Sequence, residues 1–133
     1  MKTTLRPKDA ATLVLIRKSS ASPEVLLGQR NGGHAFMPNR YVFPGGRVDP
    51  SDSRVIPATE LNHEVASRLE KNCGPARARA LAVAAVRETY EETGLMLAEK
   101  MPEGMSTSSN PAWSEFVRPV SYTHLTLPTI CSV

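Results

Sequence analysis

The sequence predicts one domain of the α/β class, and two kinds of segment predict it. Residues 10–16 are apolar and rich in β-branched side chains and stop at Arg17-Lys18, as a buried strand would. Residues 25–30 predict a second strand, which Asn31-Gly32-Gly33 ends, so the two segments look like a hairpin. Residues 60–71 and 75–93 have the amphipathic or alanine-rich character of helices. A chain of 133 residues has room for one such domain with one modest core.

The amino-acid composition is that of an ordinary globular protein. Hydrophobic residues make up 41% and charged residues 22%, which excludes a coiled coil or wholesale disorder. The formal net charge of +3 is far from the clustered basic face of a nucleic-acid binder, so no nucleic-acid partner is expected. No apolar stretch is long enough to span a bilayer and no leader-peptide pattern is present, so we expect a cytoplasmic protein with no membrane partner.

A third short strand is expected at residues 41–43, where it runs into Pro44-Gly45-Gly46. Proline is expected to end the strand ladder there, because it has no N–H to donate. The two glycines allow a close backbone approach that could bring a carbonyl group to a ligand.

The first helix is expected over residues 60–71, with Thr59 as its N-cap, because Leu61, Val65 and Leu69 recur every four residues. We expect this apolar stripe to pack on the domain or on a partner subunit, so a homodimer stays open, and we expect no chemistry there. The second helix begins near Pro75 and ends at Gly94, which suits a position just after a helix. Beyond residue 97 the sequence reads as a loop, and no strand is expected.

Three closely spaced glutamates indicate a candidate site for a divalent cation. Glu88, Glu91 and Glu92 stand at i, i+3 and i+4, so a helix places them on one face, where they repel one another. A hard divalent cation with oxygen ligands, Mg²⁺ or Mn²⁺, would relieve that repulsion. Arg87 is placed to pair with Glu91 at i+4. The alternative is an ordinary solvated acidic face.

A wider pattern surrounds these residues. Residues 87–95 resemble the second half of the Nudix box, with Thr89 where the family has an apolar residue, and residues 46–52 resemble the first half, with Asp52 where the family has glutamate. Residues 43–46, Phe-Pro-Gly-Gly, match the usual lead-in. The resemblance implies a Nudix-type α/β/α sandwich with a mixed sheet. It also implies a metal-dependent hydrolase that cleaves a pyrophosphate bond in a small molecule, a nucleoside diphosphate linked to another moiety.

The resemblance also implies roles for single residues. Glu88 and Glu92 would be direct metal ligands, Glu91 a ligand or the base that orients water, and the Gly46 carbonyl a further ligand to Mg²⁺ or Mn²⁺. Arg87 would orient the carboxylates, so Glu91 and Arg87 are the expected catalytic residues.

The box is split. Residues 53–86, which are 34 positions, separate Asp52 from Arg87, where the family usually has seven, and we assign the excess of 27 to an insertion at residues 53–79. This split box resembles a subgroup of acyl-coenzyme A diphosphatases. The coenzyme A signature of related enzymes is matched at Leu26, Leu27 and Arg30 and again at residues 43–46, while Ala35 and Asn39 depart from it.

The tail has a different character. Residues 120–129 resemble the translation of a transposon-end adapter used in sequencing libraries, so we expect residues 1–119 to be a partial Nudix domain, incomplete at its C-terminus, and residues 120–133 to be non-native. A real strand is the alternative, because tyrosine, threonine, leucine and valine favour strands. A truncated, inactive fragment and a non-enzymatic metal-binding module therefore remain alternatives to an active enzyme.

Overall fold

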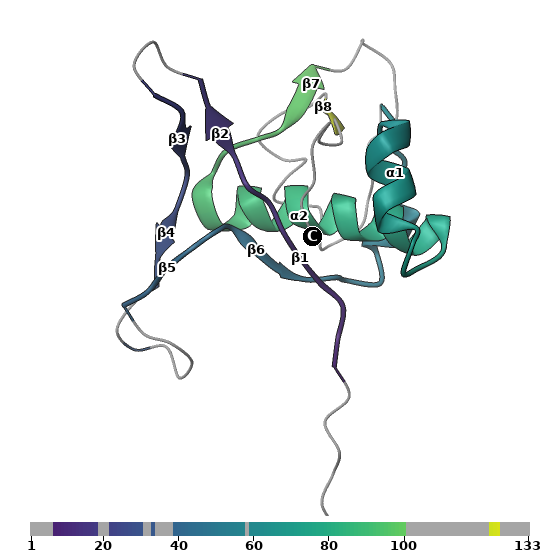
Figure 1. Ribbon diagram of the computed structural model, residues 1–133, viewed down its shortest axis with the longest axis horizontal. Helices are drawn as coiled ribbons and strands as arrows, with labels where there is room; N and C mark the ends of the chain where they lie inside the picture. The colour runs from purple at the N-terminus through teal and green to yellow at the C-terminus, as the bar shows by residue number, and fades with distance from the viewer. Residues whose placement is uncertain are drawn as a thin grey trace, which may run out of the picture.

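The computed structural model describes residues 7–18, 22–30, 33, 39–57, 59–100 and 123–125, with side chains described as far as residue 97. Helices and strands are both present, as the α/β prediction requires (Figure 1). The elements in chain order are β1 (Ala10–Thr12), β2 (Ile16–Arg17), β3 (Glu24–Val25), β4 (Gly28–Gln29), β5 (Tyr41–Val42), β6 (Gly45–Arg47), the 3-10 turn η1 (Asp52–Arg54), α1 (His63–Leu69), α2 (Pro75–Thr93), β7 (Ala98–Lys100) and β8 (Thr123–Leu125).

Three extended segments pair with one another in turn. The first segment carries β1 and β2, the second β3 and β4, and the third β5 and β6. β2 pairs with β3, β4 pairs with β5, and β6 pairs with β1. The β2–β3 pairing, Ile16 opposite Val25, confirms the predicted hairpin. Every pairing among the described strands is antiparallel, so the parallel pairs of the expected mixed sheet are not among them.

The β4–β5 ladder ends at Val42, before Pro44, as predicted, but the chain does not stop pairing there, because it takes a new partner. The chain leaves β4 after Val42, and the Pro44 carbonyl accepts a hydrogen bond from the Leu13 N–H at 2.9 Å. β6 then pairs with β1. Proline is tolerated at this point because the pairing uses its carbonyl and needs no N–H from it.

The antiparallel pairs β2–β3 and β4–β5 share one exposed apolar face. Side chains two residues apart along a strand, and residues directly opposite across a pair, lie on the same face of a sheet. The register therefore places five exposed side chains together: Ile16, Val25, Leu27, Tyr41 and Phe43. The expectation of a buried strand at residues 10–16 holds on the opposite face only, where Leu13 is 2% exposed, while Ile16 is 60% exposed.

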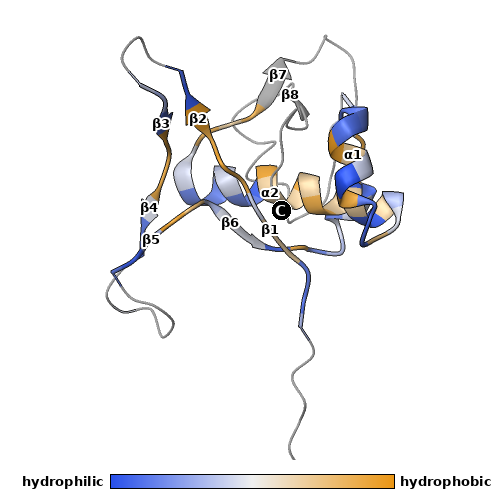
Figure 2. Cartoon of the chain, in the orientation of Figure 1, coloured by the Kyte–Doolittle hydropathy of each residue, from blue (hydrophilic) through white to orange (hydrophobic). Residues whose placement is uncertain are grey.

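α2 is the central helix. Pro75 occupies its first turn, where a missing N–H costs nothing, and Gly94 follows its last residue with φ of 73°, the left-handed conformation that glycine adopts without strain. Both predicted ends are confirmed. The alanines and valines in its middle are fully buried and form the orange stretch of α2 in Figure 2.

α1 begins later than predicted. The helix starts at His63, and its N-cap is Asn62, whose Oδ1 accepts a hydrogen bond from the Glu64 N–H at 2.8 Å, so Thr59 is not the cap. The predicted stripe is confirmed for Val65 and Leu69, which are buried on α1, whereas Leu61 precedes the helix and, partly buried, packs against them. Val65 and Leu69 form one core cluster with Ala78 of α2, so the insertion packs on the helix of its own chain.

Leu69→Ala should destabilise the chain, because Leu69 is 7% exposed in the contact between α1 and α2. Removing a buried leucine side chain costs about 2–5 kcal/mol, and urea unfolding would measure it. The control is Ile56→Ala, at a position 89% exposed, which should leave the midpoint almost unchanged. Equal shifts for the two variants would contradict the packing of α1 on α2.

The chain beyond residue 97 differs from the prediction. β7 and β8 pair antiparallel, with Ala98 opposite Leu125, so a strand does follow Leu97 and another lies within the tail. The origin of residues 120–133 stays a prediction, which sequencing of the source DNA tests. Among the described residues, no helix combines the length and the apolar character that crossing a membrane requires.

Candidate functional site

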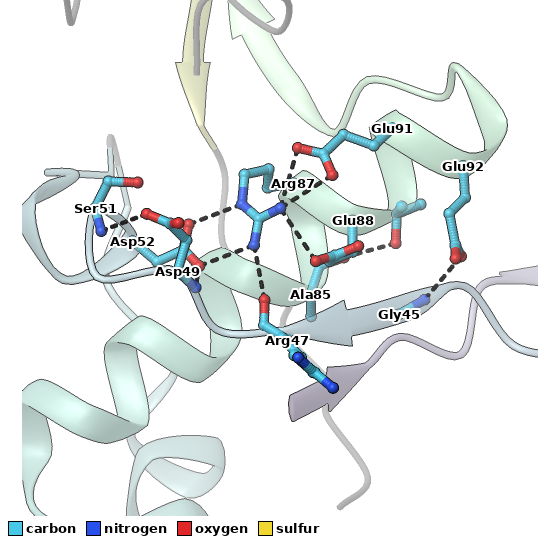
Figure 3. Close-up of polar contacts among 11 residues, drawn as sticks. Gly45, Arg47, Asp49, Ser51, Asp52, Ala85, Arg87, Glu88, Glu91 and Glu92 are labelled. Carbon is cyan, nitrogen blue, oxygen red and sulfur yellow. Dashed lines mark hydrogen bonds and ion pairs between the residues drawn. The ribbon is translucent and has the colours of Figure 1, made fainter. Parts of the chain in front are cut away.

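The candidate site lies where β6 crosses the C-terminal half of α2 (Figure 3). The two elements approach so closely that a Cβ on Gly46 would stand within 3.0 Å of the Glu88 carboxylate. The predicted reason for glycine at this position, a close backbone approach, is confirmed for Gly46 and Glu88. Only hydrogen fits between this backbone and that carboxylate.

Arg87 is the centre of the polar contacts. Its Nε and Nη2 donate to the two oxygens of Asp52 at 2.9 and 3.1 Å, and Nη2 also donates to the Arg47 carbonyl at 2.9 Å. Its Nη1 donates to Glu88 at 3.1 Å and to both oxygens of Glu91 at 3.0 Å. The predicted pairing of Arg87 with Glu91 is therefore confirmed, as one part of a larger network (Figure 3).

The Arg87 side chain is almost fully buried, with 6% exposed. Burial acts to lower the pKa of Arg87, but the hydrogen bonds to Asp52 and Glu91 outweigh it and raise that pKa above its usual value. The guanidinium is thus a permanent positive charge inside the site.

Asp52 is a residue to which the sequence alone assigned no role of its own. Its side chain is fully buried and forms a two-point ion pair with Arg87 across 35 positions of sequence. The Asp49 N–H also donates to Asp52 at 2.8 Å. The signal was present, because Asp52 stands where the family box has a carboxylate, but spacing alone does not show what that carboxylate contacts.

Asp49 shapes the turn that presents Asp52. The Ser51 N–H donates to the Asp49 carboxylate at 2.8 Å. The side chain and backbone of Ser51 hold the pKa of Asp49 below its usual value, so this carboxylate stays ionised and keeps the turn closed.

Glu88 is the most enclosed of the glutamates that contact Arg87, with 17% of its side chain exposed, against 38% for Glu91. Burial is the largest cause that raises the pKa of Glu88. Arg87 opposes this, whereas the neighbouring charges of Glu91 and Glu92 add to it. A partly desolvated carboxylate beside two others is an environment that a further positive charge would stabilise.

Glu92 faces a different partner, since its carboxylate accepts a hydrogen bond from the Gly45 N–H at 3.0 Å. The three glutamates share one side of α2 as predicted, but Glu88 and Glu91 contact Arg87 while Glu92 contacts β6. Among the described residues, no three acidic, histidine or cysteine side chains converge as a ready-made metal site.

The donor set still fits a divalent cation. Its atoms are carboxylate oxygens, which Mg²⁺ and Mn²⁺ prefer. Glu88 and Glu91 both reach the same nitrogen of Arg87, so their carboxylates already lie close together. One guanidinium faces the carboxylates of Asp52, Glu88 and Glu91, with Glu92 nearby on α2, which leaves an excess of negative charge for a cation to neutralise.

Thr89 stands where the family pattern has an apolar residue, and its hydroxyl group has a hydrogen-bond partner. Its side chain is fully buried, and its hydroxyl donates to the Ala85 carbonyl at 2.7 Å within α2. The departure from the pattern is therefore accommodated inside the helix.

Gly45→Ala should lower the stability of the fold, whereas Gly46→Ala should weaken Mg²⁺ binding. A Cβ on Gly45 would meet the backbone of β1 at Ala11 and Thr12, which cannot move without breaking the β1–β6 pair, so we expect a loss of about 1–3 kcal/mol in the free energy of unfolding. A Cβ on Gly46 would meet the end of the flexible Glu88 side chain, so we expect near-normal stability with weakened Mg²⁺ binding. Urea unfolding and calorimetric Mg²⁺ titration measure the two effects. A large stability loss in Gly46→Ala would contradict this.

Fold and site together define a class of protein: an α/β domain whose main helix presents an arginine and three glutamates beside a glycine-containing strand. No family model matches the chain. The chain is 28% identical over 115 residues to the acyl-coenzyme A diphosphatase NUDT19 of Xenopus laevis, a match that covers 71% of this chain and 30% of the relative. It is 32% identical over 103 residues to a Caenorhabditis elegans protein named as nudix hydrolase 7, covering 77% of this chain and 26% of the relative.

A solved structure gives the same result. The crystal structure of a Nudix hydrolase from Alicyclobacillus acidocaldarius matches with a TM-score of 0.62 and 29% identity, over 92% of this chain and 58% of the other. The chain belongs to the Nudix hydrolase family. It spans about a third or less of the length of the two curated relatives.

Proposed function

We propose that the protein is a hydrolase dependent on Mg²⁺ or Mn²⁺ that cleaves a pyrophosphate bond in a nucleoside diphosphate linked to another moiety. The observation that carries the proposal is the Arg87 network. It joins Asp52 and the Arg47 carbonyl from the first half of the split box to Glu88 and Glu91 from the second half. Two motifs separated by an insertion thus meet at one buried guanidinium.

In this proposal, Glu88 and Glu92 hold the cation, with the Gly46 carbonyl as a further ligand. The bound cation would supply charge neutralisation at the phosphate oxygens. Glu91 is a further ligand to the cation or the base that orients the attacking water, and it is the more exposed of the two glutamates that contact Arg87. Arg87 donates hydrogen bonds to both oxygens of the Glu91 carboxylate and so positions it before the cation binds.

For the substrate, we propose coenzyme A or acyl-coenzyme A. Two observations support it: the relative from Xenopus laevis is named as an acyl-coenzyme A diphosphatase, and Leu26, Leu27 and Arg30 match the beginning of the coenzyme A signature. The cytoplasm is the expected setting.

The test is a hydrolysis assay with the 133-residue chain, followed by ³¹P NMR. Coenzyme A, an acyl-coenzyme A and ADP-ribose would each be incubated with Mg²⁺, with Mn²⁺ and with EDTA. We expect cleavage of the pyrophosphate with either metal and none with EDTA, and fastest cleavage of a coenzyme A compound. Calorimetric binding of Mg²⁺ without cleavage of any substrate would favour the non-enzymatic metal-binding alternative, and faster cleavage of ADP-ribose would contradict the substrate proposal.

A further inference from the structure

The two edges of the Arg87 guanidinium differ in what holds them. Nε and Nη2 contact Asp52, which is fully buried, and the Arg47 carbonyl, which belongs to the backbone of β6. Among the residues that the structure describes, the partners of Nη1 are Glu88 and Glu91, and both of these side chains are more exposed than Asp52. One edge is therefore anchored to groups that cannot move away, and the other lies against groups that can exchange partners.

The Nη1 contacts occupy the acceptor atoms that a cation would use. Glu91 has both of its oxygens on this one nitrogen, each at 3.0 Å, so the bidentate position of its carboxylate is already filled. Glu88 shares the same nitrogen through Oε1. A cation bound by Glu88 and Glu91 together would lie where Nη1 now neutralises them.

Resting on the proposed function, we propose that Arg87 is an internal counter-ion that exchanges with the divalent cation. Nη1 neutralises Glu88 and Glu91 while the cation is absent and is displaced from them when it binds, whereas Nε and Nη2 stay on Asp52 and the Arg47 carbonyl. Before the cation binds, Nη1 relieves the repulsion between the like charges of Glu88 and Glu91, which otherwise would destabilise α2. The exchange also makes the metal affinity depend on how firmly Asp52 retains the arginine.

The chain provides a matched control for this exchange. Arg68 and Glu64 on α1 form an i, i+4 ion pair like that of Arg87 and Glu91, at 2.6 Å. That pair is exposed, with 64% and 72% of the side chains accessible, and within the described part of the chain no buried carboxylate pairs with Arg68 as Asp52 does with Arg87. A general effect of Mg²⁺ or of ionic strength on arginine–glutamate pairs would therefore appear at Arg68 as well.

The test is NMR of the 133-residue chain labelled with ¹⁵N-arginine, with the Arg87 and Arg68 signals assigned from Arg87→Lys and Arg68→Lys and with calorimetry run in parallel. At Mg²⁺ saturation we expect the Arg87 Nη1 signal to shift and its N–H protons to exchange faster with water. The Arg87 Nε signal and every Arg68 signal should stay in place.

Unchanged Arg87 Nη1 signals at calorimetrically confirmed saturation would overturn the exchange while leaving the proposed metal site intact. Joint movement of Nε and Nη1 would overturn the anchoring at Asp52. Absence of any Mg²⁺ binding in the calorimeter would instead mean that the proposed function fails at its metal, and the exchange with it.

Discussion

Asp52→Asn should lower the free energy of unfolding by about 3–5 kcal/mol, the usual cost of removing one partner from a buried ion pair. The variant keeps the size of the side chain but leaves the anchored edge of Arg87 facing a neutral amide, with only 6% of the Arg87 side chain accessible to water. Small domains are stable by about 5–15 kcal/mol in total, so the variant should be marginally folded. Urea unfolding followed by circular dichroism measures the change.

The control for Asp52→Asn is Glu64→Gln, which breaks the exposed pair of Glu64 with Arg68. Exposed pairs contribute at most about 1 kcal/mol, so the unfolding midpoint should hardly move. A loss below about 1 kcal/mol in Asp52→Asn would show that Glu88 and Glu91 suffice to hold Arg87, and that Asp52 is not the anchor of the guanidinium.

Glu91→Gln and Glu92→Gln should each reduce Mg²⁺-dependent hydrolysis by orders of magnitude. Each variant replaces a carboxylate that the proposed mechanism uses, for the water or for the cation, with an amide of the same shape that carries no charge. Both side chains are exposed on α2, so the fold should remain intact. The measurement is turnover by ³¹P NMR, with circular dichroism to verify folding.

Two glutamates of the insertion serve as controls for this pair. Glu60→Ala and Glu64→Ala remove carboxylates that contact Arg79 and Arg68, away from the Arg87 network. Turnover should be unchanged in both. Full activity in the α2 variants, or loss of activity without unfolding in the insertion variants, would show that the active site has been placed wrongly.

The sequence predicted the helices better than the strands. α2 is framed by residues with a local meaning, Pro75 in its first turn and Gly94 after its last, so both ends could be read directly. The start of α1 was misplaced because Thr59 and Asn62 are both good caps, and only the hydrogen bond from the Glu64 N–H distinguishes them. Strand partners depend on contacts across the chain, so the change of partner at Pro44 has no local signal.

In the candidate site too, local features could be predicted from the sequence and contacts between distant segments could not. The spacing of the glutamates on α2, the pairing of Arg87 with Glu91 and the close approach at Gly46 all follow from helix periodicity and from the small size of glycine. The partner of Glu92, the Gly45 N–H, depends on where β6 crosses α2. Tertiary packing sets that crossing, and no short pattern of residues encodes it.

The length of the insertion between Asp52 and Arg87 adds little to the entropy cost of bringing these two residues together. Lengthening a connection from seven to 34 residues makes its closure less favourable by only about 1.4 kcal/mol, because the cost grows with the logarithm of length. Burying Val65 and Leu69 against α2 contributes about 1.5–3 kcal/mol for each side chain, which counts toward the separate entropy cost of ordering the inserted residues. The two halves of the site are held by a direct ion pair and need no fixed length of chain between them, so the connecting segment can grow or shrink between homologues while Asp52 and Arg87 keep their contact.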